Sequence, residues 1–155
     1  MSELLTPETL LAHWQGHRRL TRRVIEAFPD DQLFSFSIGG MRPFGRLGWE
    51  MAGTVANTLH ALEHDDWTGK GVDAGERTNT KAALLDVWDA GTARLNAEFP
   101  SYSAQYLATE QDMAWGRGSP MRFLLYQIDN EVHHRGQGYV YLRALGIEPP
   151  PFYVR

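Results

Sequence analysis

The segment from Ser119 to Gly146 constrains the fold more than any other part of the chain, because it indicates one long helix with a signal at each end. Ser119 is a good N-cap, and Pro120 suits the first helical position. Gly146 suits the position just after a helix, and the prolines at 149–151 prevent the helix from continuing.

This predicted helix is apolar over most of its circumference. One arc of it is formed by Leu124, Ile128, Val132, Tyr139 and Leu142. A helix with this pattern is buried on more than one side. We therefore expect it to be the central helix of a bundle or to carry a dimer interface.

Three further segments repeat apolar residues with helical spacing. They run from Thr6 to Phe28, from Pro43 to Asp66 and from Thr80 to Phe99. The region from Tyr102 to Trp115 is the least clear and has room for a short extended piece. The expected fold is all-α: a four-helix bundle with long connecting loops, forming a single domain over residues 1–155.

Composition narrows the class of protein. The 155 residues include no cysteine, which excludes disulfides and any thiolate nucleophile or ligand from the chain. The formal net charge of −4 and the absence of a basic stripe argue against direct nucleic-acid binding. The stretch MSELLTPETL lacks the basic and apolar regions of a signal peptide, and no apolar run is long enough to span a membrane. We therefore expect a cytoplasmic protein with no nucleic-acid or membrane partner.

Two adjacent histidines, His133 and His134, lie within the predicted last helix. Neighbouring helical residues project about 100° apart, so both cannot face one metal ion without distortion. His133 falls with outward-looking polar residues. His134 falls on a polar and aromatic stripe with Phe123, Gln127, Asn130, Gln137 and Tyr141. Two interpretations stay open for this stripe: a hydrogen-bonded network in the core, or a ligand site.

Two other histidine pairs have the i, i+4 spacing that can hold zinc from a single helix. They are His13 with His17 and His60 with His64. The spacing alone is a weak signal, and acidic residues around the second pair are typical of a solvated helix end. Neither pair is favoured as a metal site.

Two longer motifs resemble a known family. The stretch NEVHHRGQGYVYLRALGIEPP resembles the last helix of the DinB/YfiT-like family, whose motif is close to HxxHHRGQ followed by an apolar run and a Gly-Pro-rich end. The stretch GGMRPFGRLGWEMAG resembles the start of that family's second helix, with a pattern close to M-R-S-F-x-x-L-x-x-H-I. The order, spacing and lengths of the four helices also agree, so the resemblance covers essentially the whole chain.

The resemblance implies a four-helix bundle, often dimeric, in which many members hold a divalent metal with three histidines. One histidine comes from the second helix, and two, spaced by four, come from the last. Activities in the family include metal-dependent transfer of low-molecular-weight thiols and a mycothiol-dependent isomerisation of maleylpyruvate. The metal in such a site lowers the pKa of a bound thiol or water, which creates a nucleophile at neutral pH.

Matched residue by residue, the second-helix histidine of the family falls at Glu50, and the last-helix pair falls at Asn130 and His134. The resemblance therefore implies a metal site in which a carboxylate and an amide replace two imidazoles. A carboxylate and an imidazole are reasonable ligands for zinc, iron or manganese, but an amide oxygen is a poor ligand for zinc. Thr54 and Gln137, each one turn from a site residue, are expected to support the ligands.

Two functions remain open. In the first, Glu50, Asn130 and His134 hold a divalent zinc, nickel, iron or manganese ion in a transferase or hydrolase that acts on a small molecule. The nucleophile is then an external low-molecular-weight thiol or a water. In the second, the Glu50 carboxylate accepts a hydrogen bond from protonated His134, with Asn130 bridging, in a metal-free and non-catalytic bundle that is stress-associated or ligand-binding. A homodimer is expected in either case, and no catalytic residue is assigned.

Overall fold

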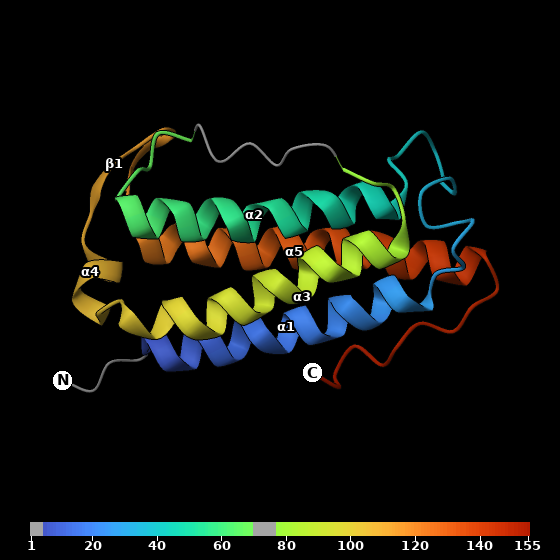
Figure 1. Ribbon diagram of the computed structural model, residues 1–155, viewed down its shortest axis with the longest axis horizontal. Helices are drawn as coiled ribbons and strands as arrows, with labels where there is room; N and C mark the ends of the chain where they lie inside the picture. The colour runs from blue at the N-terminus through green and yellow to red at the C-terminus, as the bar shows by residue number, and fades with distance from the viewer. Residues whose placement is uncertain (1–4, 70–76) are drawn as a thin grey trace.

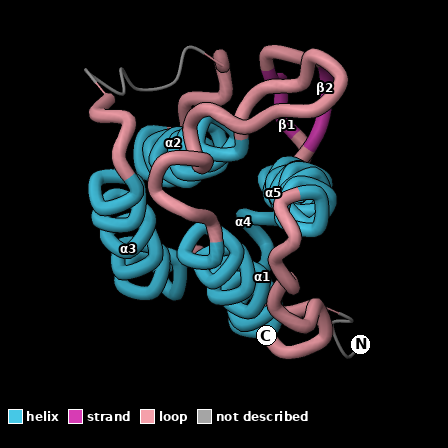
Figure 2. Tube along the Cα trace, turned by 90° about the vertical axis from the view of Figure 1, so that its right-hand side faces the viewer, coloured by secondary structure: helices cyan, strands magenta, loops and turns pink. Residues whose placement is uncertain are grey.

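The computed structural model describes residues 5–69 and 77–155, so part of the connection before the third long helix lies outside the described residues. Within these ranges four long helices lie side by side (Figure 1). They are α1 (Pro7–Ala27), α2 (Phe44–His64), α3 (Lys81–Glu98) and α5 (Pro120–Ala144). Each of α1 and α2 packs against both α3 and α5, and the end-on view in Figure 2 shows the four helices around a common centre. The expected all-α four-helix bundle is confirmed.

The predicted helix ends agree with the structure to within two residues, because local groups satisfy the backbone at those ends. Thr6, Thr80 and Ser119 each accept a hydrogen bond from the backbone N–H three residues further on. At the other end of α5, Gly146 has a φ of +76°, and the N–H of Ile147 donates to the Leu142 carbonyl at 2.9 Å. This is the glycine-terminated arrangement that the sequence predicts.

Short elements fill the region between α3 and α5. They are η1 (Phe99–Ser101), α4 (Ala104–Ala108), β1 (Gln111–Met113) and β2 (Gly116–Gly118). The two strands form an antiparallel hairpin in which Met113 is opposite Gly116, and β1 is the extended piece for which the sequence left room. Figure 1 shows the hairpin at the end of the bundle where α2 ends and α5 begins.

The core consists of two apolar clusters separated by a polar layer. One cluster gathers around Trp14, Leu59, Leu95 and Leu124. The other gathers around Phe28, Phe44, Trp88 and Tyr141. Between them, α1 and α5 bury charged side chains, including Arg18, Glu131 and Arg135.

The sequence prediction for Val132 was wrong. It placed this residue on the apolar arc of the last helix and expected it to be buried. The residue is 40% exposed, whereas its neighbour Glu131 is 3% exposed. The apolar pattern assigns charged residues to the outside, but a charged group that is fully hydrogen-bonded can face the core. As a result α5 keeps an apolar outer surface, on which Leu125, Tyr126, Val132 and Val140 are exposed.

Gly138 allows α5 to approach α2 closely, and this contact generates a prediction. A Cβ at position 138 would lie 2.5 Å from Phe44 Cε2. The Phe44 ring is fully buried and stacks on Phe28 with centroids 4.8 Å apart, so it has little room to move. We expect Gly138→Ala to lower the free energy of unfolding by about 1–3 kcal/mol, measured by urea denaturation.

Gly53→Ala is the matched control within α2. A Cβ there would meet only the Nη2 atom of Arg77, at 3.4 Å. Alanine has the higher helix propensity, so this substitution should stabilise the protein by up to about 1 kcal/mol. Equal effects of the two substitutions would contradict the close packing at Gly138.

Candidate functional site

Glu50 on α2 and His134 on α5 face each other across the bundle. The Oε1 atom of Glu50 lies 3.0 Å from Nε2 of His134. Asn130 Nδ2, one turn before His134, donates to the same carboxylate oxygen at 3.5 Å. The structure therefore brings together the three side chains that the family pattern singled out. We call these three residues the Glu50 cluster.

The surroundings of the Glu50 cluster favour a charged carboxylate. Arg42 Nη1 donates to the other oxygen, Oε2, at 2.6 Å. Partial burial raises the pKa of Glu50, but the hydrogen bonds from Arg42 and His134 outweigh this effect, and the net pKa lies below the ordinary value. The carboxylate is thus ionised at neutral pH.

The two residues expected to support the cluster behave differently. Gln137 Oε1 lies 2.8 Å from Nδ1 of His134, so it fixes the orientation of the imidazole. Thr54 lines the same hollow as Glu50, but its hydroxyl donates to the Met51 carbonyl within α2 at 2.8 Å. Of these two residues, Gln137 contacts the cluster directly.

The side chains of the Glu50 cluster carry nitrogen and oxygen atoms of the types that bind divalent cations in proteins. Two ligand atoms 3.0 Å apart can both bind one ion at about 2.1 Å each, as neighbouring ligands do. Nδ1–H of His134 donates to Gln137 Oε1, and an ion at Nε2 would take the place of the proton that Nε2 shares with Glu50. Asn130 Oδ1 is buried and has no partner among the described residues. Because the set has one nitrogen and two oxygens, it suits iron or manganese better than zinc.

Charge and ligand count work against tight metal binding at the cluster. In the described parts of the chain, no three His, Asp or Glu side chains converge in the way a metal ion needs. The Glu50 carboxylate also shares its charge with Arg42. A cation held here would therefore be bound more weakly than by three imidazoles.

The cluster borders an open hollow of about 550 Å³ on the α2 side of the bundle. Three arginines line this hollow: Arg42, Arg46 and Arg77. The Arg77 guanidinium also lies over the Trp49 ring, 5.8 Å from its centroid. The hollow therefore suits a small molecule with negative charge.

The other five histidines lie outside the Glu50 cluster. His133 is exposed on the outer side of α5, as the sequence predicts. The rings of His60 and His64 stack with centroids 4.4 Å apart. His13 Nε2 lies 3.2 Å from His17 Nε2, and Arg155 approaches the same His17 nitrogen at 3.2 Å, where its charge would repel a cation.

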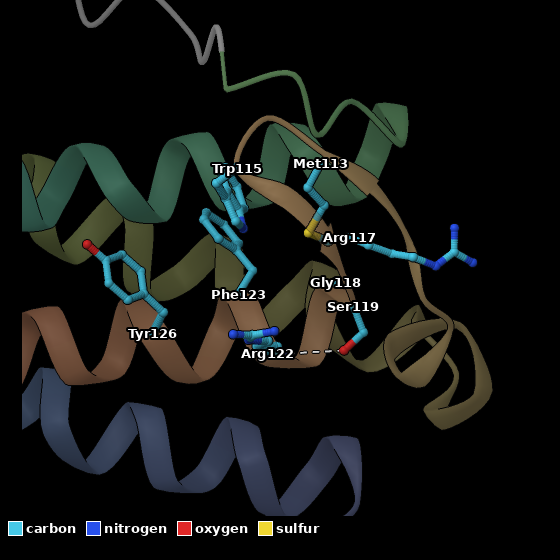
Figure 3. Close-up of a pocket in the computed structure, with 8 residues that line it drawn as sticks. All are labelled: Met113, Trp115, Arg117, Gly118, Ser119, Arg122, Phe123 and Tyr126. Atoms are coloured by element: carbon cyan, nitrogen blue, oxygen red, sulfur yellow. Dashed lines mark hydrogen bonds between the residues drawn. The ribbon is translucent and has the colours of Figure 1, made fainter.

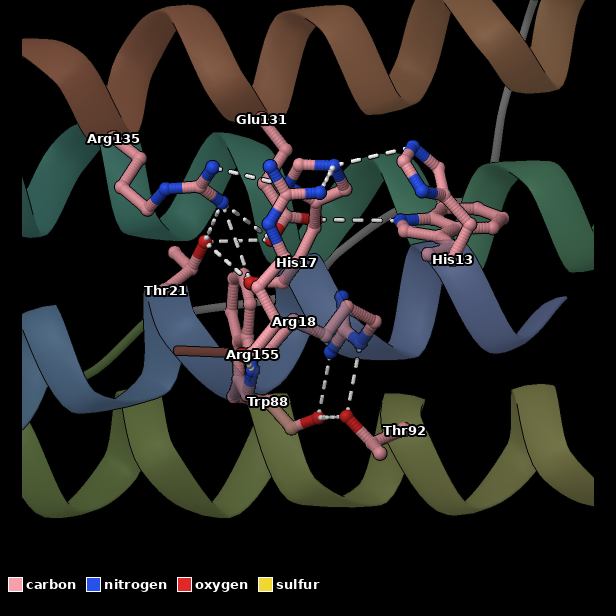
Figure 4. A network of polar contacts seen from close by, with 10 residues as sticks. His13, His17, Arg18, Thr21, Trp88, Thr92, Glu131, Arg135 and Arg155 are labelled. Atoms are coloured by element: carbon pink, nitrogen blue, oxygen red, sulfur yellow. Dashed lines mark hydrogen bonds and ion pairs between the residues drawn. The ribbon is translucent and has the colours of Figure 1, made fainter. Parts of the chain in front are cut away.

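A buried polar network on the side of α5 that faces α1 was missed by the sequence prediction (Figure 4). At its centre the Glu131 carboxylate accepts from Thr21 Oγ1 at 2.6 Å and from Trp14 Nε1 at 3.3 Å. Arg135 lies 3.9 Å from the same carboxylate and donates to Thr21 Oγ1 and to the His17 carbonyl. Despite the arginines nearby, complete burial raises the pKa of Glu131.

Arg18 links this network to α3. Its guanidinium donates to Thr92 Oγ1 at 2.9 Å and to the Trp88 carbonyl at 2.8 Å, and it stacks over the Trp88 ring. Burial lowers the pKa of Arg18 to about 10, so it stays charged at neutral pH. The signal for this network was present in the sequence: Leu124, Ile128, Glu131, Arg135, Gly138 and Leu142 form one row at helical spacing.

A family model and several solved structures resemble this chain over nearly its whole length. A model of the DinB family matches residues 1–155. A DinB-like protein from Bacillus cereus has a similar crystal structure, with a TM-score of 0.70 and 23% identity, covering 96% of this chain and 98% of that one. A DinB-like protein from Bacillus subtilis has a TM-score of 0.75 and 17% identity, and the match covers 94% of this chain and 99% of that one. A conserved protein from Enterococcus faecalis has a TM-score of 0.70 and 15% identity, and the match covers 93% of this chain and 99% of that one.

These likenesses to solved structures show the fold alone. No curated protein matches the sequence significantly. Among the described helices, none is long and apolar enough to cross a membrane.

The buried network generates a prediction about pH. Burial, with Arg135, Arg155 and His13 close by, lowers the pKa of His17 to about 4, whereas a histidine in an unfolded chain titrates near about 6.5. Between these values the unfolded state binds a proton that the folded state does not. The contribution of His17 is therefore fully present above about pH 6.5 and is lost as the pH falls toward about 4.

The free energy of unfolding of the wild type should decrease between about pH 7 and about pH 4. In His17→Gln we expect this decrease to be smaller by about 1–3 kcal/mol, measured by urea unfolding. Glu131, whose pKa is raised by burial, has the opposite effect on stability. Its contribution to the free energy of unfolding is lost as the pH rises. The exposed His133, replaced by Gln, is the control and should leave the wild-type pH profile unchanged. A His17→Gln protein with the wild-type slope would contradict a neutral, buried His17.

Proposed function

The chain belongs to the DinB family, and on that premise we propose that it is an enzyme with a divalent-cation centre at Glu50, Asn130 and His134. The reaction proposed is transfer to, or hydrolysis of, a small molecule. The observation that carries the proposal is the 3.0 Å approach of Glu50 Oε1 to His134 Nε2 beside the unpartnered Asn130 Oδ1. A buried amide oxygen without a donor is costly, and a cation would satisfy it.

The residues around the centre have separate roles in this proposal. Glu50, Asn130 and His134 hold the ion, which when bound lowers the pKa of a coordinated thiol or water. Gln137 keeps the imidazole oriented through the 2.8 Å contact with Nδ1. Because the chain has no cysteine, the thiol or water comes from outside the protein.

Arginines in the hollow beside the centre indicate the substrate class. Arg46 and Arg77 line the hollow together with Arg42, which already pairs with Glu50. A guanidinium recognises a carboxylate or phosphate with two parallel hydrogen bonds. The substrate proposed is therefore a small molecule with at least one anionic group.

A second candidate function is favoured by the contacts of Glu50. Both of its oxygens already have hydrogen-bond partners, one with Arg42 and one with His134 and Asn130. Such a cluster is stable without an ion. On this alternative the protein is a metal-free member of the family that binds a ligand in the hollow and catalyses no reaction.

Calorimetric titration with Mn²⁺, Fe²⁺, Ni²⁺ and Zn²⁺ tests the proposed centre. We expect one saturable cation per chain, with His134→Ala weakening binding by at least about 100-fold and Gln137→Leu by about 10–100-fold. The adjacent and exposed His133, replaced by Ala, is the matched control and should bind like the wild type. If the wild type shows no saturable binding up to about 1 mM, the metal-free alternative holds.

Activity is followed as transfer of a low-molecular-weight thiol to a chromogenic, anionic electrophile. The metal-dependent proposal predicts a rate that chelation abolishes and that returned cation restores. Activity that survives both chelation and His134→Ala would contradict the proposed centre.

The proposal includes a homodimer formed through the outer face of α5. Leu125, Val132 and Val140 are 41%, 40% and 55% exposed, and their spacing places them on one side of the helix. Exposed apolar side chains in a continuous strip are typical of protein interfaces. Two copies of this face, related by a twofold axis, would cover each other.

Substitution at this strip tests the dimer. By light scattering we expect the wild type at twice the mass of one chain and Val140→Arg at the mass of one chain, because two buried guanidinium groups would oppose association. Val87→Arg is the control, since Val87 is similarly exposed, at 47%, but lies on α3. A wild-type monomer at about 50 μM would contradict the dimer.

A further inference from the structure

A cavity separate from the Glu50 cluster lies between the β1–β2 hairpin and the first turns of α5 (Figure 3). Its volume is about 460 Å³, which falls within the range of pockets that take small molecules. The side chains that give it its chemistry are Met113, Trp115, Arg117, Arg122, Phe123 and Tyr126.

Aromatic rings form the main wall of this cavity. Trp115 stacks on Phe123 with centroids 5.0 Å apart and an interplanar angle of 20°. On its other side Phe123 meets the buried Trp67 edge to face, at 5.5 Å, so Phe123 is held in place. Trp115 and Tyr126 nevertheless remain 56% and 62% exposed. Two large exposed rings in one cavity offer flat apolar surface that a planar ligand would cover.

The two arginines of the cavity differ in their partners. Arg117 lies 3.5 Å from Glu110 and 3.6 Å from Asp112, and Figure 3 shows it extending away from the rings. The guanidinium of Arg122 has no ion pair or hydrogen bond with any side chain in the described part of the protein, and the backbone N–H of Arg122 donates to Ser119 Oγ at 3.3 Å. The cavity therefore contains one uncompensated positive charge next to the aromatic wall.

An unpaired acceptor lies in the adjoining cavity, which Trp115 and Phe123 also line. There Gln127 is 7% exposed, and its Oε1 atom is buried without a hydrogen-bond partner among residues 5–69 and 77–155. A buried amide oxygen of this kind is normally satisfied by a donor. Ring substituents that donate hydrogen bonds would find an acceptor on this side of the aromatic pair.

From these features we propose that the cavity binds a planar aromatic carboxylate. The ring stacks on the Trp115–Phe123 wall, and the carboxylate pairs with Arg122. A cationic ligand is disfavoured by the free guanidinium, and a polyanion is disfavoured because only one unpaired arginine is present. This site is independent of the proposed metal centre and would bind its ligand in the presence of a chelator.

Tryptophan fluorescence provides a direct readout of this site. Of the five tryptophans, Trp14, Trp49, Trp67 and Trp88 are at most 7% exposed, so a ligand in the cavity changes mainly the emission of Trp115. The probes are 2-naphthoate and its neutral isostere 2-naphthamide, each titrated in the presence of a chelator. We expect 2-naphthoate to bind saturably and about three- to tenfold more tightly than the amide.

Arg122→Ala should remove this preference for the anion while leaving the affinity for 2-naphthamide unchanged. Arg117→Ala is the matched control and should behave like the wild type, because Arg117 is already paired within the hairpin. Trp115→Phe should lose the fluorescence signal but keep binding in calorimetry. Equal affinity for the two probes, an equal loss in both arginine variants, or no saturable binding would each overturn the proposal.

Discussion

The buried carboxylate of Glu131 sets the position of α5 against its neighbours in the bundle. It joins α5 to α1 through Thr21 and Trp14, and Arg18 and Arg135 supply positive charge on either side. Removing one partner of a buried charged group typically costs about 3–5 kcal/mol, so sliding or rotating α5 by one residue would be strongly unfavourable. The network thus fixes the rotation of α5 about its axis.

This rotation positions the Glu50 cluster. Residues 130 and 134 are four apart, so their side chains project within about 40° of each other, whereas residue 131 projects about 100° from residue 130. With Glu131 directed at α1, Asn130 and His134 are directed at α2, where Glu50 meets them. The close approach of α5 to α2 at Gly138 and Phe44 reinforces the same geometry. A carboxylate that contacts no ligand therefore determines where the candidate ligands point.

Sequence patterns predicted the helices and the Glu50 cluster but not the interior of α5. Helix ends were predictable because Thr6, Thr80, Ser119 and Gly146 act locally. Glu50 and His134 were predictable because a family pattern fixes their places on two helices. Val132 was misassigned and the burial of Glu131 was missed, because hydrophobicity ranks side chains singly, whereas the burial of Glu131 depends on donors from α1. The aromatic cavity was missed because it depends on how the hairpin folds back over Phe123.

The two polar clusters beside α5 differ in their exposure to solvent. On the α1 side, the Glu131 carboxylate is buried and accepts hydrogen bonds from Thr21 and Trp14, and Arg18 Nη1 in the same network has no partner among the described residues. On the α2 side, the Glu50 side chain is 34% exposed at an open hollow, and Asn130 Oδ1 has no donor in the part of the chain that the structure describes. Arg42 holds Oε2 of Glu50, and an ion at the proposed centre would replace the hydrogen bonds that Oε1 accepts from His134 and Asn130. In the proposed centre, one carboxylate oxygen, one imidazole nitrogen and one amide oxygen would leave coordination positions open, as catalytic metal sites do.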